Sequence, residues 1–267
     1  MRVLLLLIVL WMPWHSAIAA ERILALAPHV CEILYAIGAQ DEIVGAVDYC
    51  DYPEAALAIP RVGGYQKVYL EPALRTDPTL AIAMGRGVAG VSQIEAKDVR
   101  IVESYPNSME GVIADIRNIG EITGHSEKAN VVAAGLQKRL QRVRQLQQGK
   151  KPIRVFYEVW GDPLITSGKN NFISSLLHEA GAQNIFDDID IDTPRVNVES
   201  VIRARPDVVV IPTESRDVEQ RKIFWRRWLG EEIRFIVVQH DLMHRPGPRL
   251  IDGLEMLQKA LNAEKLQ

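Results

Sequence analysis

The sequence has 267 residues, a formal net charge of −3 at pH 7 and 48% hydrophobic side chains. A chain of this length can form two modest α/β lobes or one large domain. Its charges are mixed in sign and contain no long basic run, which argues against a nucleic-acid partner.

The first 19 residues have the pattern of a secretory signal peptide. Arg2 supplies a positive charge, an apolar run follows over residues 3–11, and Ala17-Ile18-Ala19 provides a small-x-small cleavage site. A membrane anchor is the alternative, but the run is too short to span a bilayer and Pro13 interrupts its end. No cysteine follows the cleavage point, so a lipid anchor is not expected there. We therefore expect a cleavable signal peptide over 1–19 and a periplasmic location.

Short apolar segments alternate with amphipathic helical segments along most of the remaining chain. Strands are predicted at residues 22–27, 43–47, 79–83 and 99–103, and helices at 31–37 and 72–76. Residues 108–148 are wholly helical, with one helix at 109–122 and a long one at 127–148. The alternation resumes at residue 153 and includes a strand at 208–211.

This order of elements is typical of α/β folds in which helices cover parallel sheets. It predicts an N-terminal α/β lobe over residues 20–107 and a C-terminal α/β lobe over 150–267. A helical segment over 108–149, containing one long linker helix, is expected to join them.

The two halves of the chain resemble each other. ILYAIGAQ at residues 33–40 matches LLHEAGAQ at 176–183. Leu70-Glu71 precedes an apolar strand, and Val198-Glu199 precedes another at the same point of the second half. Two matches in the same order favour an internal repeat. We therefore expect two similar lobes with a ligand site in the cleft between them.

Glu71 and Glu199 each precede a predicted short helix. Free backbone N–H groups and the helix dipole stabilise a carboxylate there, so capping alone explains both residues. One acid at an equivalent place on each lobe also offers two matched anchors for a basic partner.

A glycine-rich segment could indicate dinucleotide binding. Residues 85–90 match G-x-G-x-x-G, and Glu103 stands near the position of a ribose-binding acid. However, the segment before the next strand is short for a crossover helix, and the unit does not open the domain. A flexible loop at the edge of the cleft is the preferred interpretation, and an exported dinucleotide-dependent enzyme is the distant alternative.

Histidines provide two further candidate sites. His240 and His244 have a spacing that could hold a metal, but the prolines at 246 and 248 predict a loop, where this spacing has no special geometry. His29 follows Pro28 at the turn into the first helix, and we expect it to be a solvent-exposed turn residue on the cleft side. Neither G-x-S-x-G nor H-E-x-x-H occurs, so no catalytic residue, metal or cofactor is expected.

Cys31 and Cys50 are the two cysteines of the sequence. In an oxidising compartment a pair is more often a disulfide than a metal site, and two thiols alone make a poor zinc site. A disulfide is therefore favoured, with free thiols as the alternative.

Several segments in order carry a resemblance over nearly the whole mature chain. They are RILALAP at 22–28, DYP at 51–53, VGGY at 62–65, YEVW at 157–160, TSGK at 166–169, GAQNIF at 181–186 and RPGPR at 245–249. Together they resemble the cobalamin and iron-chelate periplasmic binding proteins of ABC importers. The resemblance implies two α/β lobes bridged by a long helix, limited hinge motion and a ligand in the cleft.

The same resemblance implies roles for individual residues. Glu71 and Glu199 would dock onto arginines of the membrane permease. Cleft contacts carry over onto Tyr49, Tyr65, Asp241 and Arg245, and Trp160 is near another such position.

The sequence also departs from its cobalamin-binding relatives. Met84 and Thr193 stand where those relatives have tryptophans, and Met can serve as a soft contact. His29 stands where a small residue is common, and an imidazole could approach a corrin cobalt or a haem iron. The resemblance also places Cys31 and Cys50 on cleft-facing loops, where a local disulfide is plausible.

The expected function is that of a monomeric receptor that binds cobalamin or a related corrinoid. It would deliver this ligand to an ABC permease and its ATPase subunits, with no enzymatic activity and no cofactor of its own. A ferric siderophore or haem is the alternative ligand. Because siderophores usually carry negative charge, that alternative requires several cationic side chains in the cleft, and the candidates are Arg86, Arg195 and Arg245.

Overall fold

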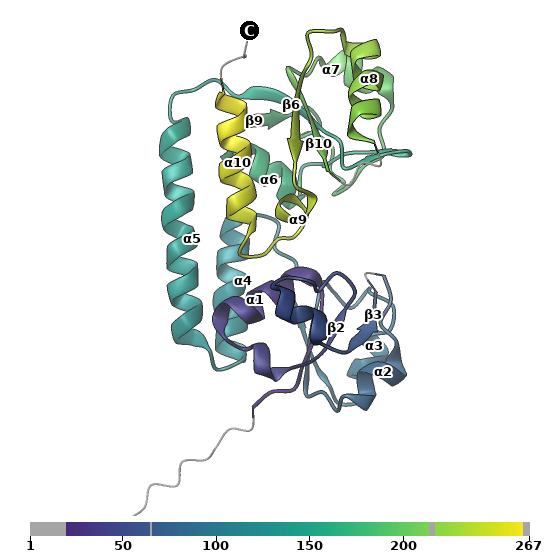
Figure 1. The fold of residues 1–267 in the computed structure, drawn as a ribbon, viewed down its shortest axis with the longest axis vertical. Helices are drawn as coiled ribbons and strands as arrows, with labels where there is room; N and C mark the ends of the chain where they lie inside the picture. Colours follow the sequence, from purple (N-terminus) through teal and green to yellow (C-terminus); the bar gives the residue numbers. More distant parts are fainter. Residues whose placement is uncertain (1–19, 65, 214–216, 264–267) are drawn as a thin grey trace, which may run out of the picture.

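The computed structural model describes residues 20–64, 66–213 and 217–263 of the chain. A long helix, α5 (Ser126–Gln147), runs along one side of the molecule, and one parallel sheet lies toward each of its ends (Figure 1). The predicted signal peptide and Tyr65 lie outside the described residues.

The first sheet is formed by β1 (Ile23–Leu26), β2 (Ile43–Val47), β3 (Arg61–Gly63), β4 (Leu80–Ala83) and β5 (Arg100–Glu103). Its order is β3-β2-β1-β4-β5, and every neighbouring pair is parallel. All side chains of β1 and β4 are buried, because these strands lie inside a sheet that is covered on both faces. The strands predicted in this region are confirmed to within one residue at each end.

The first sheet is covered by α1 (Pro28–Ile37), α2 (Leu70–Arg75) and α3 (Val91–Glu95), with short 3₁₀ turns at Gln40–Glu42 and Glu54–Ala58. Helix α1 begins at Pro28, whose ring fixes a helical φ and whose missing N–H would have no partner there. It ends at Gly38, which has a φ of 83° that a side chain would strain. The helix therefore starts three residues before the predicted range of 31–37.

The connection between the sheets consists of two helices that pack against each other, α4 (Met109–Ile122) and α5. Ser108 caps α4 by accepting a hydrogen bond from the backbone N–H of Gly111 at 3.0 Å. Where α4 and α5 meet, a Cβ on Gly120 would lie only 2.2 Å from Ala129 Cβ. Helix α5 contacts α1 of the first lobe and also the helices of the second, so it joins the two lobes as expected.

The second sheet is formed by β6 (Ile153–Tyr157), β9 (Ala182–Asn184), β10 (Val208–Pro212) and β11 (Arg234–Val238). Its order is β11-β10-β6-β9, again with parallel neighbours. Around it lie a small hairpin, β7 (Trp160–Gly161) with β8 (Leu164–Ile165), and the helices α6 (Phe172–Glu179), α7 (Val198–Ala204), α8 (Val218–Leu229), α9 (His240–Met243) and α10 (Leu250–Asn262). Helix α10 packs beside α5 (Figure 1).

The two sheets have equivalent connections. In the first, β1 lies between β2 and β4, and in the second β6 lies between β9 and β10. The matched segments occupy matched places, because Gly38 after α1 and Gly181 after α6 both have positive φ, at 83° and 86°. Likewise, α2 precedes β4 and α7 precedes β10. The predicted internal repeat is confirmed at the level of topology, and the fold is α/β with two lobes.

No helix in the described part of the chain is both long enough and apolar enough to cross a membrane.

Candidate functional site

A cavity of about 220 Å³ lies between the two lobes. From the first lobe it is lined by residues that follow the ends of β1, β4 and β5, namely His29, Met84 and Tyr105. From the second it is lined by the start of α6 and by the segment after α9, including Asn171, His244 and Arg245. This is the edge of parallel sheets at which ligands bind, and it is the place that the internal repeat predicts.

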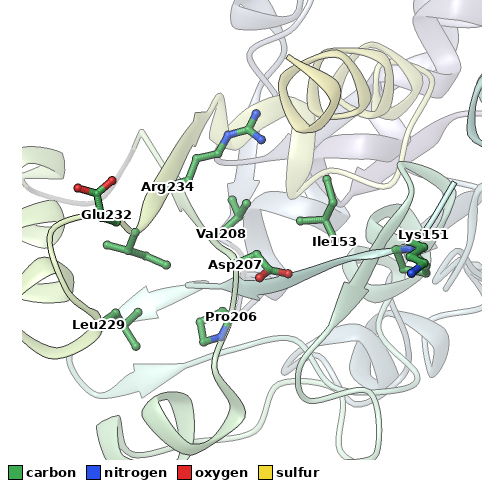
Figure 2. Close-up of a pocket in the computed structure, with 10 residues that line it drawn as sticks. Lys151, Ile153, Pro206, Asp207, Val208, Leu229, Glu232 and Arg234 are labelled. Atoms are coloured by element: carbon green, nitrogen blue, oxygen red, sulfur yellow. The ribbon is translucent and has the colours of Figure 1, made fainter. Parts of the chain in front are cut away.

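A larger groove of about 570 Å³ lies at the opposite edge of the second sheet (Figure 2). It is lined by residues at the amino ends of β6, β10 and β11, such as Ile153, Val208 and Arg234. Arg234 donates to the backbone oxygens of Ala260 and of Leu261, the latter at 3.1 Å, so its guanidinium satisfies the last carbonyls of α10. Because this groove contains residues of one lobe only, we assign the ligand site to the smaller cavity between the lobes.

His29 is buried beside the cavity, so the prediction of a solvent-exposed turn residue is wrong. Its Nε2 lies 3.2 Å from the backbone oxygen of Ser104 and 2.8 Å from Ser104 Oγ. A carbonyl oxygen can only accept, so Nε2 carries the ring proton. Burial lowers the pKa of His29 from 6.5 to about 4, although the bond to the Ser104 backbone opposes this shift. The ring is therefore neutral at pH 7, with its lone pair on Nδ1.

Ser104 continues this chain of hydrogen bonds by donating from Oγ to Asp115 Oδ2 at 2.5 Å. Burial raises the pKa of Asp115, and the bond from Ser104 lowers it in part. His29, Ser104 and Asp115 are the residue types of a hydrolase triad, but their hydrogen bonds run in the opposite direction. His29 donates to the serine hydroxyl and therefore cannot accept its proton. Ser104 is also buried, at 1% exposure, so it is not an activated nucleophile.

His244 is the second imidazole of the cavity. Its Nε2 lies 3.0 Å from the hydroxyl of Tyr157, and its ring centroid lies 4.2 Å from that of His240. Burial and the nearby His240 lower the pKa of His244 to about 3. The prediction of a loop was wrong here, because His240–Met243 form the short helix α9. Within the described residues, no group of three or more His, Cys, Asp or Glu side chains is arranged to hold a metal ion.

Arg245 is the charged side chain that lines the cavity, and it is already surrounded by carboxylates. Its guanidinium lies 2.6 Å from Asp51, 2.8 Å from Asp241 and 3.4 Å from Glu32. Burial opposes its charge, but these three ion pairs raise its pKa above the ordinary value. Arg249 forms two further hydrogen bonds to Glu32, at 2.5 and 3.0 Å. We call these five residues the Arg245 cluster (Glu32, Asp51, Asp241, Arg245 and Arg249).

Cys31 and Cys50 form a disulfide, with their Cα atoms 5.9 Å apart. Cys31 lies in α1 and not on a loop as the resemblance implied, because that helix begins at Pro28. Cys50 lies in the segment that follows β2, and both residues are buried.

The structure brings only some of the predicted ligand contacts together. His29, Met84 and Arg245 line the cavity, and Asp241 contacts Arg245 without lining the cavity. Tyr49 and Trp160 are 63% and 48% exposed and do not line it, although each follows the carboxyl end of a strand in its sheet. Thr193 does line it.

Three polar residues that line the cavity, Tyr105, Asn171 and His244, were missed by the sequence analysis. Tyr105 is the second residue after β5, and its hydroxyl donates to Asp192 of the other lobe at 3.1 Å. Asn171 caps α6 by accepting from the Ile173 N–H at 2.9 Å, and His244 was set aside as part of a loop. The rule that binding residues follow the carboxyl ends of parallel strands could have identified Tyr105.

Glu71 and Glu199 lie in the first turns of α2 and α7, and both are exposed. Glu71 forms an exposed ion pair with Arg75 at 2.5 Å. Helix α7 is capped instead by Asn197, which accepts from the Ser200 N–H at 2.8 Å. Glu199 is therefore not required as the capping residue of α7.

The three arginines considered for an anionic ligand do not converge. Arg86 forms ion pairs with Glu95 and Glu103, and neither Arg86 nor Arg195 lines the cavity with Arg245. The same contacts argue against dinucleotide binding, because Glu103 is engaged and α3 after the Gly-rich segment has only five residues.

Known proteins share both the sequence and the fold. A family model described as "Periplasmic binding protein" matches residues 23–224. The vitamin B12-binding protein of Photorhabdus laumondii is 30% identical over 251 residues, which cover 93% of this chain and 90% of that protein. The crystal structure of the periplasmic vitamin B12-binding protein of Vibrio cholerae has a TM-score of 0.81 at 28% identity, covering 91% of this chain and 99% of that chain.

A periplasmic haem-binding protein of Roseiflexus has a TM-score of 0.77 at 24% identity, with 90% of this chain and 97% of that chain covered, and this likeness shows the fold alone. The family model covers residues 23–224, and the sequence and structural matches each extend over more than 90% of the chain. This chain belongs to the periplasmic binding protein family.

Proposed function

We propose that this chain is a periplasmic receptor that captures cobalamin or a related corrinoid in the cavity between its lobes and delivers it to an ABC importer. The observation that carries the proposal is that Arg245, the charged side chain lining the cavity, is neutralised by its carboxylate partners. It is taken together with relatives that are named vitamin B12-binding proteins. The mature receptor works as a monomer with two lobes, 20–107 and 150–267, joined by the segment 108–149. It carries an export signal over residues 1–19.

The charge of the cavity distinguishes a corrinoid from its main rivals. In the Arg245 cluster, two guanidinium groups face three carboxylates, which leaves one excess negative charge. Haem carries two propionates and siderophores are usually anionic, so either ligand would meet uncompensated negative charge. The periphery of a corrinoid consists mainly of uncharged amides, which can accept from Arg245 and donate to its carboxylates.

The cavity would enclose only part of a corrinoid, and the rest of the ligand would lie at its rim. Sites for small molecules enclose about 300–1,000 Å³, so the cavity alone is too small for a whole corrinoid. Tyr49 stands two residues before Asp51, a partner of Arg245, and Trp160 follows the lining residue Val159. Both are exposed, on opposite lobes, and would offer aromatic faces to the part of the ligand outside the cavity. Met84 supplies an adaptable apolar contact inside.

The permease would be recognised through Glu71 and Glu199. They lie on equivalent helices of the two lobes, both are exposed, and neither is buried in a structural ion pair. Arginines on the permease would provide complementary charges for this pair. ATP hydrolysis belongs to the ATPase subunits of the importer, and the receptor itself performs no chemistry.

Isothermal titration of the purified mature chain tests the ligand directly. We expect one-to-one binding of cyanocobalamin, and much weaker binding of haemin and of a ferric hydroxamate siderophore. Tight binding of haemin without binding of cyanocobalamin would overturn the corrinoid assignment while leaving the receptor fold in place.

A further inference from the structure

The two cysteines are each followed directly by an acidic residue of the Arg245 cluster. Cys31 precedes Glu32 on α1, and Cys50 precedes Asp51 after β2. The disulfide therefore fixes two backbone segments of the first lobe at the points from which these two carboxylates project. Segments 19 residues apart in sequence are held with Cα atoms 5.9 Å apart.

Both carboxylates are directed at the same short segment of the second lobe, Arg245–Arg249. Glu32, at 4% exposure, accepts from Arg249 at 2.5 Å and lies 3.4 Å from Arg245. Asp51 accepts from Arg245 at 2.6 and 3.2 Å. The next residue, Tyr52, places its ring 3.7 Å from the Arg249 guanidinium carbon.

Arg245 also lines the ligand cavity, so these contacts determine where its guanidinium lies. A long side chain without such partners would sample several rotamers and would lose that freedom on binding a ligand. In this structure the ordering is supplied by Asp241 on α9 and by the two carboxylates beside the disulfide. The guanidinium is held before the ligand arrives.

We propose that the Cys31–Cys50 disulfide is a positioning device that holds Glu32 and Asp51 against Arg245 and thereby sets the affinity of the cavity for its ligand. This inference rests on the proposed function, because it takes Arg245 as a ligand contact. Asp51 lies in an irregular segment and depends on the cross-link more than Glu32, which α1 already holds. Reduction is therefore expected to release mainly the contact between Asp51 and Arg245.

A double-mutant cycle separates positioning from simple stabilisation. The affinity for cyanocobalamin is measured in the wild type, in Cys31→Ser/Cys50→Ser, in Arg245→Met, and in the triple variant. Breaking the disulfide is expected to raise Kd about tenfold when Arg245 is present, within the coupling energies of one ion-pair network. In the Arg245→Met background it should change Kd less than about twofold, because the disulfide then has no guanidinium to position.

An equal loss of affinity in both backgrounds would overturn the proposal and leave the disulfide with a purely structural role. Unchanged affinity in both backgrounds would overturn it as well. Circular dichroism and thermal unfolding of each variant establish that the compared chains are folded.

Hydrogen exchange of the ligand-free protein tests the same inference if cyanocobalamin does not bind. In Cys31→Ser/Cys50→Ser, a peptide over residues 244–250 should exchange faster than in the wild type, because its arginines lose a fixed partner. A peptide over β10 should not change, since its strand lies inside the other sheet. Equal exchange over 244–250 in both proteins would overturn the positioning role, whereas failure of cyanocobalamin binding alone overturns only the corrinoid assignment.

Discussion

His29 and His244 are kept neutral by burial at the centre of the molecule. An unfolded chain would bind a proton at each below pH 6.5, whereas the folded chain binds one at His29 only near pH 4. Between these values the unfolded state holds more protons, so the free energy of unfolding falls as the pH falls. For His29 alone this linkage amounts to roughly 3 kcal/mol.

The pH dependence of urea unfolding tests this linkage. We expect His29→Gln to flatten the loss of stability between pH 6.5 and 4, after allowing for a lower stability at pH 7. His178→Gln is the matched control with the opposite sign. The Asp187 side chain raises the pKa of His178, so this histidine adds stability as the pH falls toward 6.5 and a constant amount below it. Its removal should therefore change the profile above pH 6.5 and leave the slope between pH 6.5 and 4 nearly unchanged. Parallel pH profiles for the wild type and His29→Gln would contradict the buried neutral state.

Two exposed tryptophans allow a controlled test of the cavity rim. Trp160→Ala is expected to raise the Kd for cyanocobalamin by at least about fivefold, because a stacked aromatic contributes about 1 kcal/mol. Trp228→Ala should leave Kd unchanged, since this side chain is equally exposed, at 46% against 48%, but lies on α8 away from the cavity. If neither Trp160→Ala nor Trp228→Ala lowers the affinity, the ligand does not extend over the hairpin that contains Trp160.

At the residue scale the sequence indicates which side chains follow strand ends, but not how deeply they are buried. His29 has a polar side chain next to a turn, but it is buried in the fold, where Ser104 and Gly247 lie against it. Arg245 could be assigned to the cleft by resemblance. Asp241 stands only four residues before it, but Glu32 and Asp51 come from α1 and from the segment after β2, and no sequence pattern pairs residues that far from Arg245.

Helices α4 and α5 show how a single glycine can set the distance between elements. Gly120→Ala is expected to lower the free energy of unfolding by about 1–3 kcal/mol, because the added methyl group would overlap with Ala129. Gly135→Ala in the exposed middle of α5 should raise it by about 0.5–1 kcal/mol, because no atom lies within 4 Å and alanine favours the helix. Denaturant titration measures the free energy of unfolding of both variants. If both substitutions stabilise the protein, α4 and α5 lie further apart at Gly120 than the structure shows.

Elements with strong local signals were predicted well. Ser108 and the glycines at 38 and 124 mark helix ends, and the buried strands are continuous apolar runs between turn residues. Helix α9 was missed because two prolines follow it closely, and one turn of helix has too little periodicity to outweigh them. The start of α1 was placed late because Pro28 was taken as a turn residue, whereas proline also suits the first position of a helix.

For the whole molecule, the pairing of lobes predicts how the receptor engages its importer. Reversing both charges, Glu71→Arg with Glu199→Arg, should abolish cobalamin uptake while leaving the Kd for cyanocobalamin unchanged. Glu127→Arg is the matched control, because Glu127 is also an exposed glutamate in the first turn of a helix, but lies on α5. Uptake assays in cells that carry the matching importer measure the first quantity, and titration measures the second. A parallel loss of affinity in the double variant would contradict the docking role.

The two-lobed architecture was predictable because the segment at 33–40 is repeated at 176–183. The strands around the two segments have equivalent orders in their sheets. The cleft followed from the same repeat. The contacts that join the lobes across the cleft could not be predicted from the repeat. The hydrogen bond from Tyr105 to Asp192 and the Arg245 cluster depend on the final separation of the sheets.

Helix α5 contacts helices of both lobes. Its Arg139 also forms ion pairs with Asp252 and Glu255 of α10, at 2.6 and 2.7 Å. If these contacts hold the two lobes at a constant separation, the distance between Glu71 and Glu199 is the same with and without ligand. A permease that measures this spacing would accept an empty receptor as readily as a loaded one. Empty receptors would occupy the importer as competitors, so the rate of uptake would depend on the fraction of receptors that carry ligand as well as on their number.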